Sequence, residues 1–292
     1  MRCYKLSYEK KGSAVALGTF DGIHKGHLAV LRSALDSGFS PIAVTFRAPP
    51  KGSPCILTAE DKLKYLKEFG FDETVIFEFS EIKDTSPEDF LNMLKTRLSP
   101  KMFCCGFNYR FGKNAEGDTD FLARYCKENG IAFSVSDPVF EGDRVVSSTA
   151  VRSMIANGET GAANRLLYKP FGFSAEVVRG DRRGRLLGFP TVNQHPPKGL
   201  VTPRFGVYAT KALLDGRVYN AVTNFGIRPT FKVDEPQAET FIFDADGDFY
   251  GKNIRLYFVD FLRPEKRFSS PEELEAAVDN DKKTALAVLS SE

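Results

Sequence analysis

The sequence predicts an α/β domain with a parallel sheet, followed by an antiparallel β-barrel domain that ends in a helix. In the first half, apolar runs alternate with amphipathic helical segments, the pattern of strand–helix–strand units. From about residue 173, short runs rich in β-branched and aromatic residues follow one another, which is typical of a barrel or sandwich. Because 292 residues exceed one compact domain, we place a junction near 168–172 and expect domains at 1–168 and 169–292.

The expected elements of the first domain alternate in type along the chain. A buried strand is expected at 14–18, and further strands at 41–46, 74–79, 101–107 and 131–136. A helix at 26–37 carries Leu28, Leu31 and Leu35 on one face, and Gly38 follows it. Further helices are expected after the caps Thr58 and Ser86 and over 118–129. This alternation predicts a Rossmann-like sheet with helices on both faces.

The second half contains apolar runs at 174–180, 206–214, 217–226, 240–245 and 253–262. Asp215-Gly216 and Asp246-Gly247 are tight-turn signals between such runs. The tail has Ser270 as an N-cap, Pro271 next and Glu273 in position for a capping box, so it predicts one long helix. We expect this helix to pack on the barrel.

Composition excludes several classes of protein. Forty basic and 38 acidic residues leave a net charge of +2, which argues against a nucleic-acid surface. No run is long enough to cross a bilayer, and the first residues contain no apolar segment typical of export. Five cysteines without a C-x-x-C pair favour buried, reduced thiols over disulfides or zinc. We therefore expect a cytoplasmic protein.

Three polar clusters follow expected strand ends, at 18–27, 106–110 and 147–152. Ligands of open α/β sheets bind at such ends, where glycines admit a close approach and helix N-termini offer N–H groups to phosphate. Histidine and arginine add positive charge. The clusters predict a nucleoside-triphosphate site that contains Gly18, Phe20, Asp21, Gly22, His24, His27, Asn108, Ser148, Thr149 and Arg152.

Simpler explanations exist for each cluster. Two histidines three residues apart are also half of a metal site, although no third ligand is evident, and Ser-Ser-Thr is commonly only a helix cap. The segment G-F-N-Y-R-F-G-K-N imitates a phosphate-binding loop, but five residues separate its glycines where four are required, and Asn114 replaces Ser or Thr.

In this order, G-T-F-D-G-I-H-K-G-H, G-F-N-Y-R-F-G-K and S-S-T-A-V-R resemble the prokaryotic FAD synthetases, which are HxGH nucleotidyltransferases. The resemblance implies that FMN attacks the α-phosphate of ATP, giving FAD and pyrophosphate. His24 and His27 would hold the phosphates, Ser148, Thr149 and Arg152 would grip the phosphate tail, and Asn108 would lie between ATP and FMN. Catalysis would consist of positioning and charge neutralisation with Mg²⁺.

One segment departs from that family. After the second strand the family usually has a pattern like T-F-D-P-H-P, whereas this chain has Thr45-Phe46-Arg47-Ala48-Pro49-Pro50. A phosphate-contacting histidine is missing, and Arg47 occupies the acidic position. Either Arg47 supplies the lost positive charge or adenylylation is weakened.

In the second domain, G-D-R-R-G-R-L-L-G-F-P-T-V-N (180–193), R-F-G-V-Y-A and T-N-F-G-I-R-P-T-F resemble the riboflavin kinase module that is fused to these synthetases. The resemblance implies a flap over ATP and flavin that contains Gly180, Gly184, Arg185, Gly188 and Pro190. Thr191 and Asn193 would offer oxygens to Mg²⁺. Glu239 would be the general base for the ribityl 5′-hydroxyl. Without the resemblance, the first run is a basic surface hairpin and Glu239 a solvent-facing carboxylate.

The sequence thus predicts a bifunctional enzyme that phosphorylates riboflavin and adenylylates FMN, with ATP, riboflavin and FMN as small-molecule substrates. Mg²⁺ is the expected cofactor; no nucleic-acid or membrane partner is expected, and the protein should be a monomer or a weak homo-oligomer. Two alternatives stay open for the first domain. It binds nucleotide or flavin without turnover, or it transfers a nucleotidyl group, with CTP as an alternative donor, to another acceptor.

Overall fold

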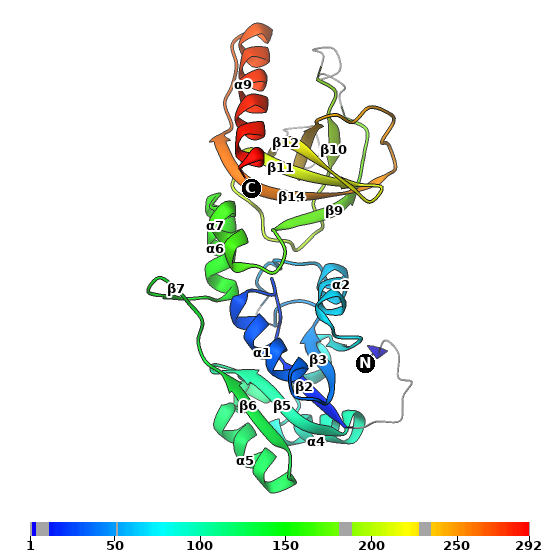
Figure 1. The fold of residues 1–292 in the computed structure, drawn as a ribbon, viewed down its shortest axis with the longest axis vertical. Helices are drawn as coiled ribbons and strands as arrows, with labels where there is room; N and C mark the ends of the chain where they lie inside the picture. Colours follow the sequence, from blue (N-terminus) through cyan, green and yellow to red (C-terminus); the bar gives the residue numbers. More distant parts are fainter. Residues whose placement is uncertain (1, 4–11, 51, 181–188, 228–234, 292) are drawn as a thin grey trace. The chain divides into compact units, whose positions relative to one another are not determined.

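The computed structural model describes residues 2–3, 12–50, 52–180, 189–227 and 235–291. They form two compact units, which divide between Ser148 and Thr149 (Figure 1). Each unit has its own sheet and its own core, and each is described separately below.

The first unit is built on the predicted parallel sheet. Its parallel strands are β2 (Ser13–Leu17), β3 (Ser40–Phe46), β4 (Glu73–Phe77), β5 (Pro100–Gly106) and β6 (Ala132–Ser136). They lie in the order β4-β3-β2-β5-β6, so the chain reverses its direction of winding at β2. The sequence did not suggest the short strand β1 (Arg2–Cys3), which pairs antiparallel with β4, or the hairpin of β7 (Phe140–Glu141) and β8 (Arg144–Val145). The predicted fold of this half is confirmed.

Helices cover both faces of this sheet. They are α1 (Lys25–Leu35), α2 (Ala59–Phe69), α3 (Phe79–Ile82), α4 (Pro87–Leu98) and α5 (Thr119–Asn129), with a 3-10 turn at Lys113–Ala115. Helices α4 and α5 pack on the face that carries Val15 and Leu17. Helix α1 packs against β2, β3 and β5. Because side chains alternate along a strand, α1 lies over the small Ala14 and Ala16 on the other face.

Local sequence explains where these helices begin and end. Thr58 and Ser86 accept hydrogen bonds from the third residue of their helices, as their cap positions predict. Helix α1 begins at Lys25 with His24 as its cap, one residue earlier than expected. Its buried face is formed by Val30, Leu31 and Ala34, and Leu28 and Leu35 are only partly buried.

The cysteines of the first unit are free thiols at the four positions for which side chains are described. Cys104 and Cys105 are fully buried, and burial raises the pKa of both thiols to about 12. Since the thiolate is the reactive form, these two residues act as small core side chains.

The second unit is a nearly closed antiparallel barrel. Helices α6 (Ser148–Asn157) and α7 (Thr160–Leu166) precede it, of which α7 was not predicted. The strands are β9 (Gly172–Glu176), β10 (Val192–Gln194), β11 (Gly206–Leu214), β12 (Arg217–Ile227), β13 (Pro236–Ile242) and β14 (Asn253–Pro264). They pair in the order β10-β13-β12-β11-β14-β9, and a bridge between Val178 and Asn193 joins the two edges. The predicted barrel is confirmed.

The two turn signals had different outcomes. Asp215 and Gly216 both have positive φ (49° and 81°) and join the paired strands β11 and β12, as predicted. The prediction for Asp246-Gly247 was wrong, because β13 and β14 are not neighbours in the sheet. The chain between them is a loop that must pass around the barrel end rather than close a hairpin.

The terminal helix α9 (Pro271–Ser290) packs on the outer face of the barrel, as expected. Its Ala285 and Leu289 contact Val207, Ala209 and further apolar side chains of that face. A bidentate pair fixes the helix to β14, because Arg263 Nε and Nη2 lie 2.8 and 2.6 Å from the carboxylate oxygens of the buried Asp281.

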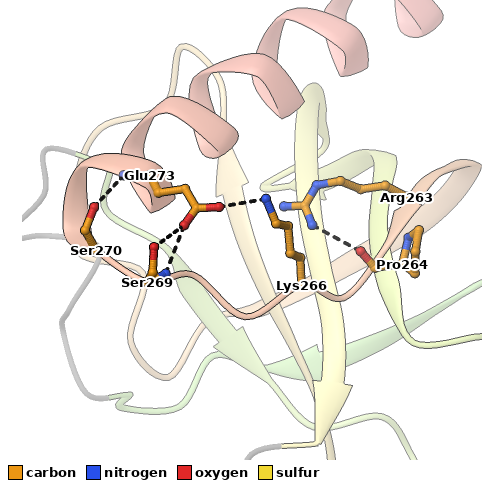
Figure 2. A network of polar contacts seen from close by, with 6 residues as sticks. All are labelled: Arg263, Pro264, Lys266, Ser269, Ser270 and Glu273. Carbon is orange, nitrogen blue, oxygen red and sulfur yellow. Dashed lines mark hydrogen bonds and ion pairs between the residues drawn. The ribbon is translucent and has the colours of Figure 1, made fainter.

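The start of α9 departs from the expected capping box (Figure 2). Ser270 accepts from the Glu273 amide at 3.3 Å, as predicted. The Glu273 carboxylate, however, accepts from the backbone N–H and hydroxyl of Ser269 (2.9 and 2.8 Å) and pairs with Lys266 at 2.7 Å. These contacts, that with Lys266 foremost, lower the pKa of Glu273 to about 2.

Candidate active sites

The first candidate site is the loop that joins β2 to α1, at the carboxyl edge of the parallel sheet. Phe20 (φ 46°), Gly22 (φ 89°) and Ile23 (φ 45°) all have left-handed backbone conformations, although Phe20 and Ile23 are buried. Gly18 is required by space, because a Cβ there would lie 2.8 Å from the Phe20 ring. Side chains other than glycine are strained in this region. The loop is therefore held in an unfavourable backbone conformation, which is a common property of functional sites.

Two histidine rings stack at the start of α1. The ring centroids of His24 and His27 are 3.7 Å apart, and the planes differ by 16°. His24 Nδ1 accepts from the His27 amide at 3.3 Å, which assigns the His24 proton to Nε2. His27 Nδ1 is buried and has no hydrogen-bond partner among the described residues. Burial, with the charges of His24 and Lys62, holds the pKa of His27 well below its ordinary value.

Buried polar contacts tie this loop to its surroundings. The Asp21 carboxylate accepts from the amides of Ile56 and Leu57 at 2.8 and 3.3 Å. Ser148 Oγ donates to the Asp21 carbonyl at 2.8 Å, so the first and third sequence clusters do meet. Asp21 thus connects the loop after β2 to the segment at Ile56 and Leu57, just before α2.

The remaining predicted residues of this site have different settings. Asn108 is exposed just after β5. Thr149 and Arg152 belong to the second compact unit, where Arg152 Nη2 lies 3.4 Å from Thr149 Oγ1. Arg47 lies 2.6 Å from Glu78 and 3.8 Å from Glu60. Two carboxylates therefore already oppose the charge that was a candidate substitute for the missing histidine.

A buried lysine on α2 is the residue that the sequence analysis missed here. Lys62 is 1% exposed, and its Nζ donates to the carbonyls of Phe46 (2.7 Å) and Thr19 (3.0 Å), at the ends of β3 and β2. Burial lowers its pKa to about 8, while Asp21 and Cys55 act in the opposite direction. Tyr65, Leu66 and Phe69 follow it at helical spacing, a signal that places position 62 on the buried face.

The second candidate site lies on the outer face of the barrel. Asn193, Glu239 and Asn224 are cross-strand partners on β10, β13 and β12. Opposed residues share a face, with Cβ atoms roughly 5 Å apart. The predicted base and one predicted metal ligand are therefore side by side, and Asn224 is a third polar group that the sequence analysis did not single out.

The surroundings of Asn193 suit an oxygen-seeking cation. Asn193 is 6% exposed, and its Oδ1 has no hydrogen-bond donor among the described residues. Gly180 lies against its amide, since a Cβ on Gly180 would be 2.4 Å from Asn193 Nδ2. Thr191 is half-buried and Pro190 exposed. Gly184, Arg185 and Gly188 lie outside the described residues.

Helix α9 reaches this site through Lys282, which was also not predicted. Its Nζ lies 5.1 Å from the ring centroid of Phe189 and 4.5 Å from that of Phe241. Phe241 is two residues beyond Glu239 and points to the same face of β13. A cation–π contact of this kind links the helix to both segments that border the site.

Comparison with known proteins assigns a family model to each half of the chain. The family model described as FAD synthetase matches residues 6–150, and that described as riboflavin kinase matches residues 167–289. Proteins described as bifunctional riboflavin kinase/FMN adenylyltransferase are 30% identical in Bacillus subtilis (98% of this chain, 95% of that protein) and 33% identical in Escherichia coli K12 (94% and 92%).

A solved structure has the same two-unit fold. A chain from Streptococcus pneumoniae, described as a macrolide-efflux protein, superposes with a TM-score of 0.87 at 28% identity, over 94% of this chain and 93% of that one. In this chain, no helix within the described ranges is long and apolar enough to cross a membrane.

Fold and sites together define a two-domain transferase, with a nucleotidyltransferase unit followed by a barrel kinase unit. The chain belongs to the bifunctional riboflavin kinase/FMN adenylyltransferase family.

Proposed function

We propose that this protein makes FAD in two ATP-dependent steps, with residues 169–292 forming FMN from riboflavin and residues 1–168 forming FAD from FMN. The observation that carries the proposal is that two family models, one for each reaction, match successive parts of one chain. The stacked histidines at the carboxyl edge of the first sheet and the Asn193–Glu239 pair of the barrel support it.

In the kinase step, Glu239 accepts the proton of the ribityl 5′-hydroxyl as that oxygen attacks the γ-phosphate of ATP. The new bond joins this oxygen to phosphorus, and ADP leaves. Thr191 and Asn193 hold Mg²⁺, for which the unsatisfied Asn193 Oδ1 is a suitable ligand. When bound, Mg²⁺ neutralises charge on the phosphates. Gly180 and Pro190 border the nucleotide and flavin, and the role of Gly184, Arg185 and Gly188 stays a prediction from the sequence.

In the adenylylation step, a phosphate oxygen of FMN attacks the α-phosphate of ATP, and pyrophosphate leaves. His24 Nε2 carries the proton, because Nδ1 of that ring accepts from the His27 amide, and this N–H would donate to a phosphate oxygen. Protonating both stacked rings, His24 and His27, would place two positive charges side by side, which is unfavourable. The second ring is therefore protonated only after the negatively charged phosphate has bound. Gly18, Phe20, Asp21 and Gly22 shape the loop, while Asn108, Ser148, Thr149 and Arg152 contact substrate.

Incubation of the purified protein with riboflavin, ATP and Mg²⁺ tests the proposal. Chromatography of the flavins over time should show FMN first and FAD afterwards. FMN that accumulates without FAD would favour the second candidate, a working kinase joined to a domain that only binds. The pairing of Arg47 with Glu78 is the observation behind that candidate. Competition between ATP and CTP in the second step identifies the nucleotide that is used.

Several properties stay predictions from the sequence. They are the cytoplasmic location, the monomeric or weakly oligomeric state and the lack of a nucleic-acid partner.

A further inference from the structure

Lys62 places a buried positive charge at the carboxyl edge of the first sheet, and neither proposed reaction step assigns it a role. The Lys62 ammonium donates to Phe46 O and Thr19 O, which belong to neighbouring strand ends. Burying an ammonium costs several kcal/mol unless it is well compensated. A simple packing role at this position would be filled by an apolar side chain.

The need of the Thr19 carbonyl for a donor does not explain the lysine either. The Thr19 carbonyl already accepts from Thr45 Oγ1 at 2.7 Å. The charge itself is therefore the property to be explained. Asp21 from the loop and Cys55 from the segment before α2 both act on the Lys62 ammonium, and Lys62 in turn acts on His27 of α1.

Position distinguishes Lys62 from Arg47, which also lies at this edge. Arg47 is turned to Glu78 and Glu60, and it is about two-fifths exposed. Lys62 is buried between the strained loop and the end of β3, at the segment that lacks the family's acidic residue and histidine. A charge fixed there acts on a polyphosphate through little solvent, where screening is weak.

We propose that Lys62 is a positioning residue of FMN adenylylation: its buried ammonium joins the loop after β2 to the end of β3 and fixes the loop that leads into His24 and His27. This assignment depends on the adenylylation step proposed above. It adds a residue from α2 to a site otherwise built from the loop, α1 and the start of α6.

Substitutions at Lys62 separate charge from hydrogen bonding. Lys62→Gln keeps two N–H donors and loses the charge, whereas Lys62→Arg keeps both. We expect kcat for FAD formation from FMN and ATP to fall on the order of a hundredfold in Lys62→Gln, as for a misplaced catalytic loop, and to be largely retained in Lys62→Arg. Lys64→Gln, on an exposed position of the same helix, should match the unaltered protein.

The effect of the Lys62 charge can also be measured by NMR, as the titration of the His27 ring. In Lys62→Gln, the His27 ring should titrate at a higher pH than in the unaltered protein by NMR, because a neighbouring positive charge is gone. A folded Lys62→Gln protein with FAD formation within about twofold of normal would overturn the proposal. So would a loss of activity with an unmoved His27 titration, which indicates structure alone.

The pH dependence of FAD formation in the unaltered protein and in Lys62→Arg tests the proposal even if Lys62→Gln does not fold. The value of kcat/KM for FAD formation reports the free enzyme. It should fall as pH rises through about 8, where Lys62 loses its proton, and this loss should disappear in Lys62→Arg, since a guanidinium stays charged. An alkaline loss that persists unchanged in Lys62→Arg contradicts the role of Lys62. Loss of FAD formation in the unaltered protein would instead contradict the proposed function.

Discussion

At the scale of single residues, each candidate site depends on a polar atom that the protein itself leaves unsatisfied. His27 Nδ1 and Asn193 Oδ1 are both buried without a hydrogen-bond partner among the described residues. Such an atom costs about 1–3 kcal/mol when no ligand is present. Binding of phosphate at His27 and of a cation at Asn193, as proposed above, would recover that free energy and favour the liganded state.

Glu239 provides the residue-scale prediction. Glu239→Gln keeps the shape of the side chain and removes its ability to accept a proton. We expect FMN formation from riboflavin to fall by about 10²–10⁴-fold, while FAD formation from supplied FMN continues. Initial rates of the two reactions, measured separately by chromatography, check this. Glu235→Gln, at an exposed carboxylate just before β13, is the matched control; equal loss of both activities in Glu239→Gln would argue against separate sites.

At the scale of elements, two carboxylates of α9 form polar contacts of different chemistry, one with strand β14 and one with the segment that joins β14 to the helix. Asp281 is buried and forms two short charge-assisted hydrogen bonds with Arg263 on β14. Glu273 is at the helix start and binds Lys266 and Ser269 near the surface (Figure 2).

Loss of the buried attachment should destabilise the second unit. Asp281→Asn leaves Arg263 with one neutral acceptor, and we expect a loss of about 1–3 kcal/mol, less than for a fully buried pair because Arg263 is 27% exposed. Urea unfolding followed by NMR signals of α9 measures this change. Asp279→Asn, at an exposed carboxylate of the same helix, should cost at most about 1 kcal/mol.

The attachment at Glu273 should depend on pH. The pKa of Glu273 in the folded protein, about 2, lies below its ordinary value. Its contribution is therefore complete above about pH 4.5 and is lost as pH falls from there towards 2. The urea midpoint of the second unit should differ between the unaltered protein and Glu273→Gln at pH 6 and converge near pH 2. Glu275→Gln, which changes an exposed carboxylate in the next turn, should show no such convergence.

At the scale of the whole molecule, the two reactions are joined by one compound, FMN, which the barrel unit releases and the first unit uses. His27→Ala should form FMN and fail to form FAD, while Glu239→Gln should do the reverse. A mixture of the two variants should therefore convert riboflavin to FAD, with FMN passing through solution. His195→Ala, at an exposed histidine, should behave as the unaltered protein. A mixture that forms FMN and no FAD would mean that FMN does not pass from one molecule to another.

The sequence was sufficient for the fold because alternation of strands and helices and well-placed caps both report local preferences. Thr58, Ser86 and Ser270 cap the helices that they were expected to cap. It was insufficient where a residue's role depends on distant neighbours. Asp246-Gly247 has turn chemistry, yet pairing elsewhere in the barrel makes it a loop.

The same limit applies to the sites. The cross-strand neighbours of Glu239 are set by the register of β10 and β12, which no local pattern specifies. Lys282 is a charged residue in an exposed-looking helix and meets its aromatic partners only through packing. Lys62 is the exception, because its spacing from Tyr65 and Leu66 already indicates that it lies on the buried face of its helix. It was missed because a charged residue is normally expected on the exposed face.

The backbone of the loop after β2 has a consequence for how this protein can change over generations. Phe20 and Ile23 each occupy a conformation that costs of order 1–3 kcal/mol, and glycine would relieve it. Selection for heat resistance alone would favour that replacement, whereas selection for flavin supply would oppose it if the strained loop is what aligns the two histidines. The loop is thus a position at which laboratory evolution for stability and growth would choose opposite alleles.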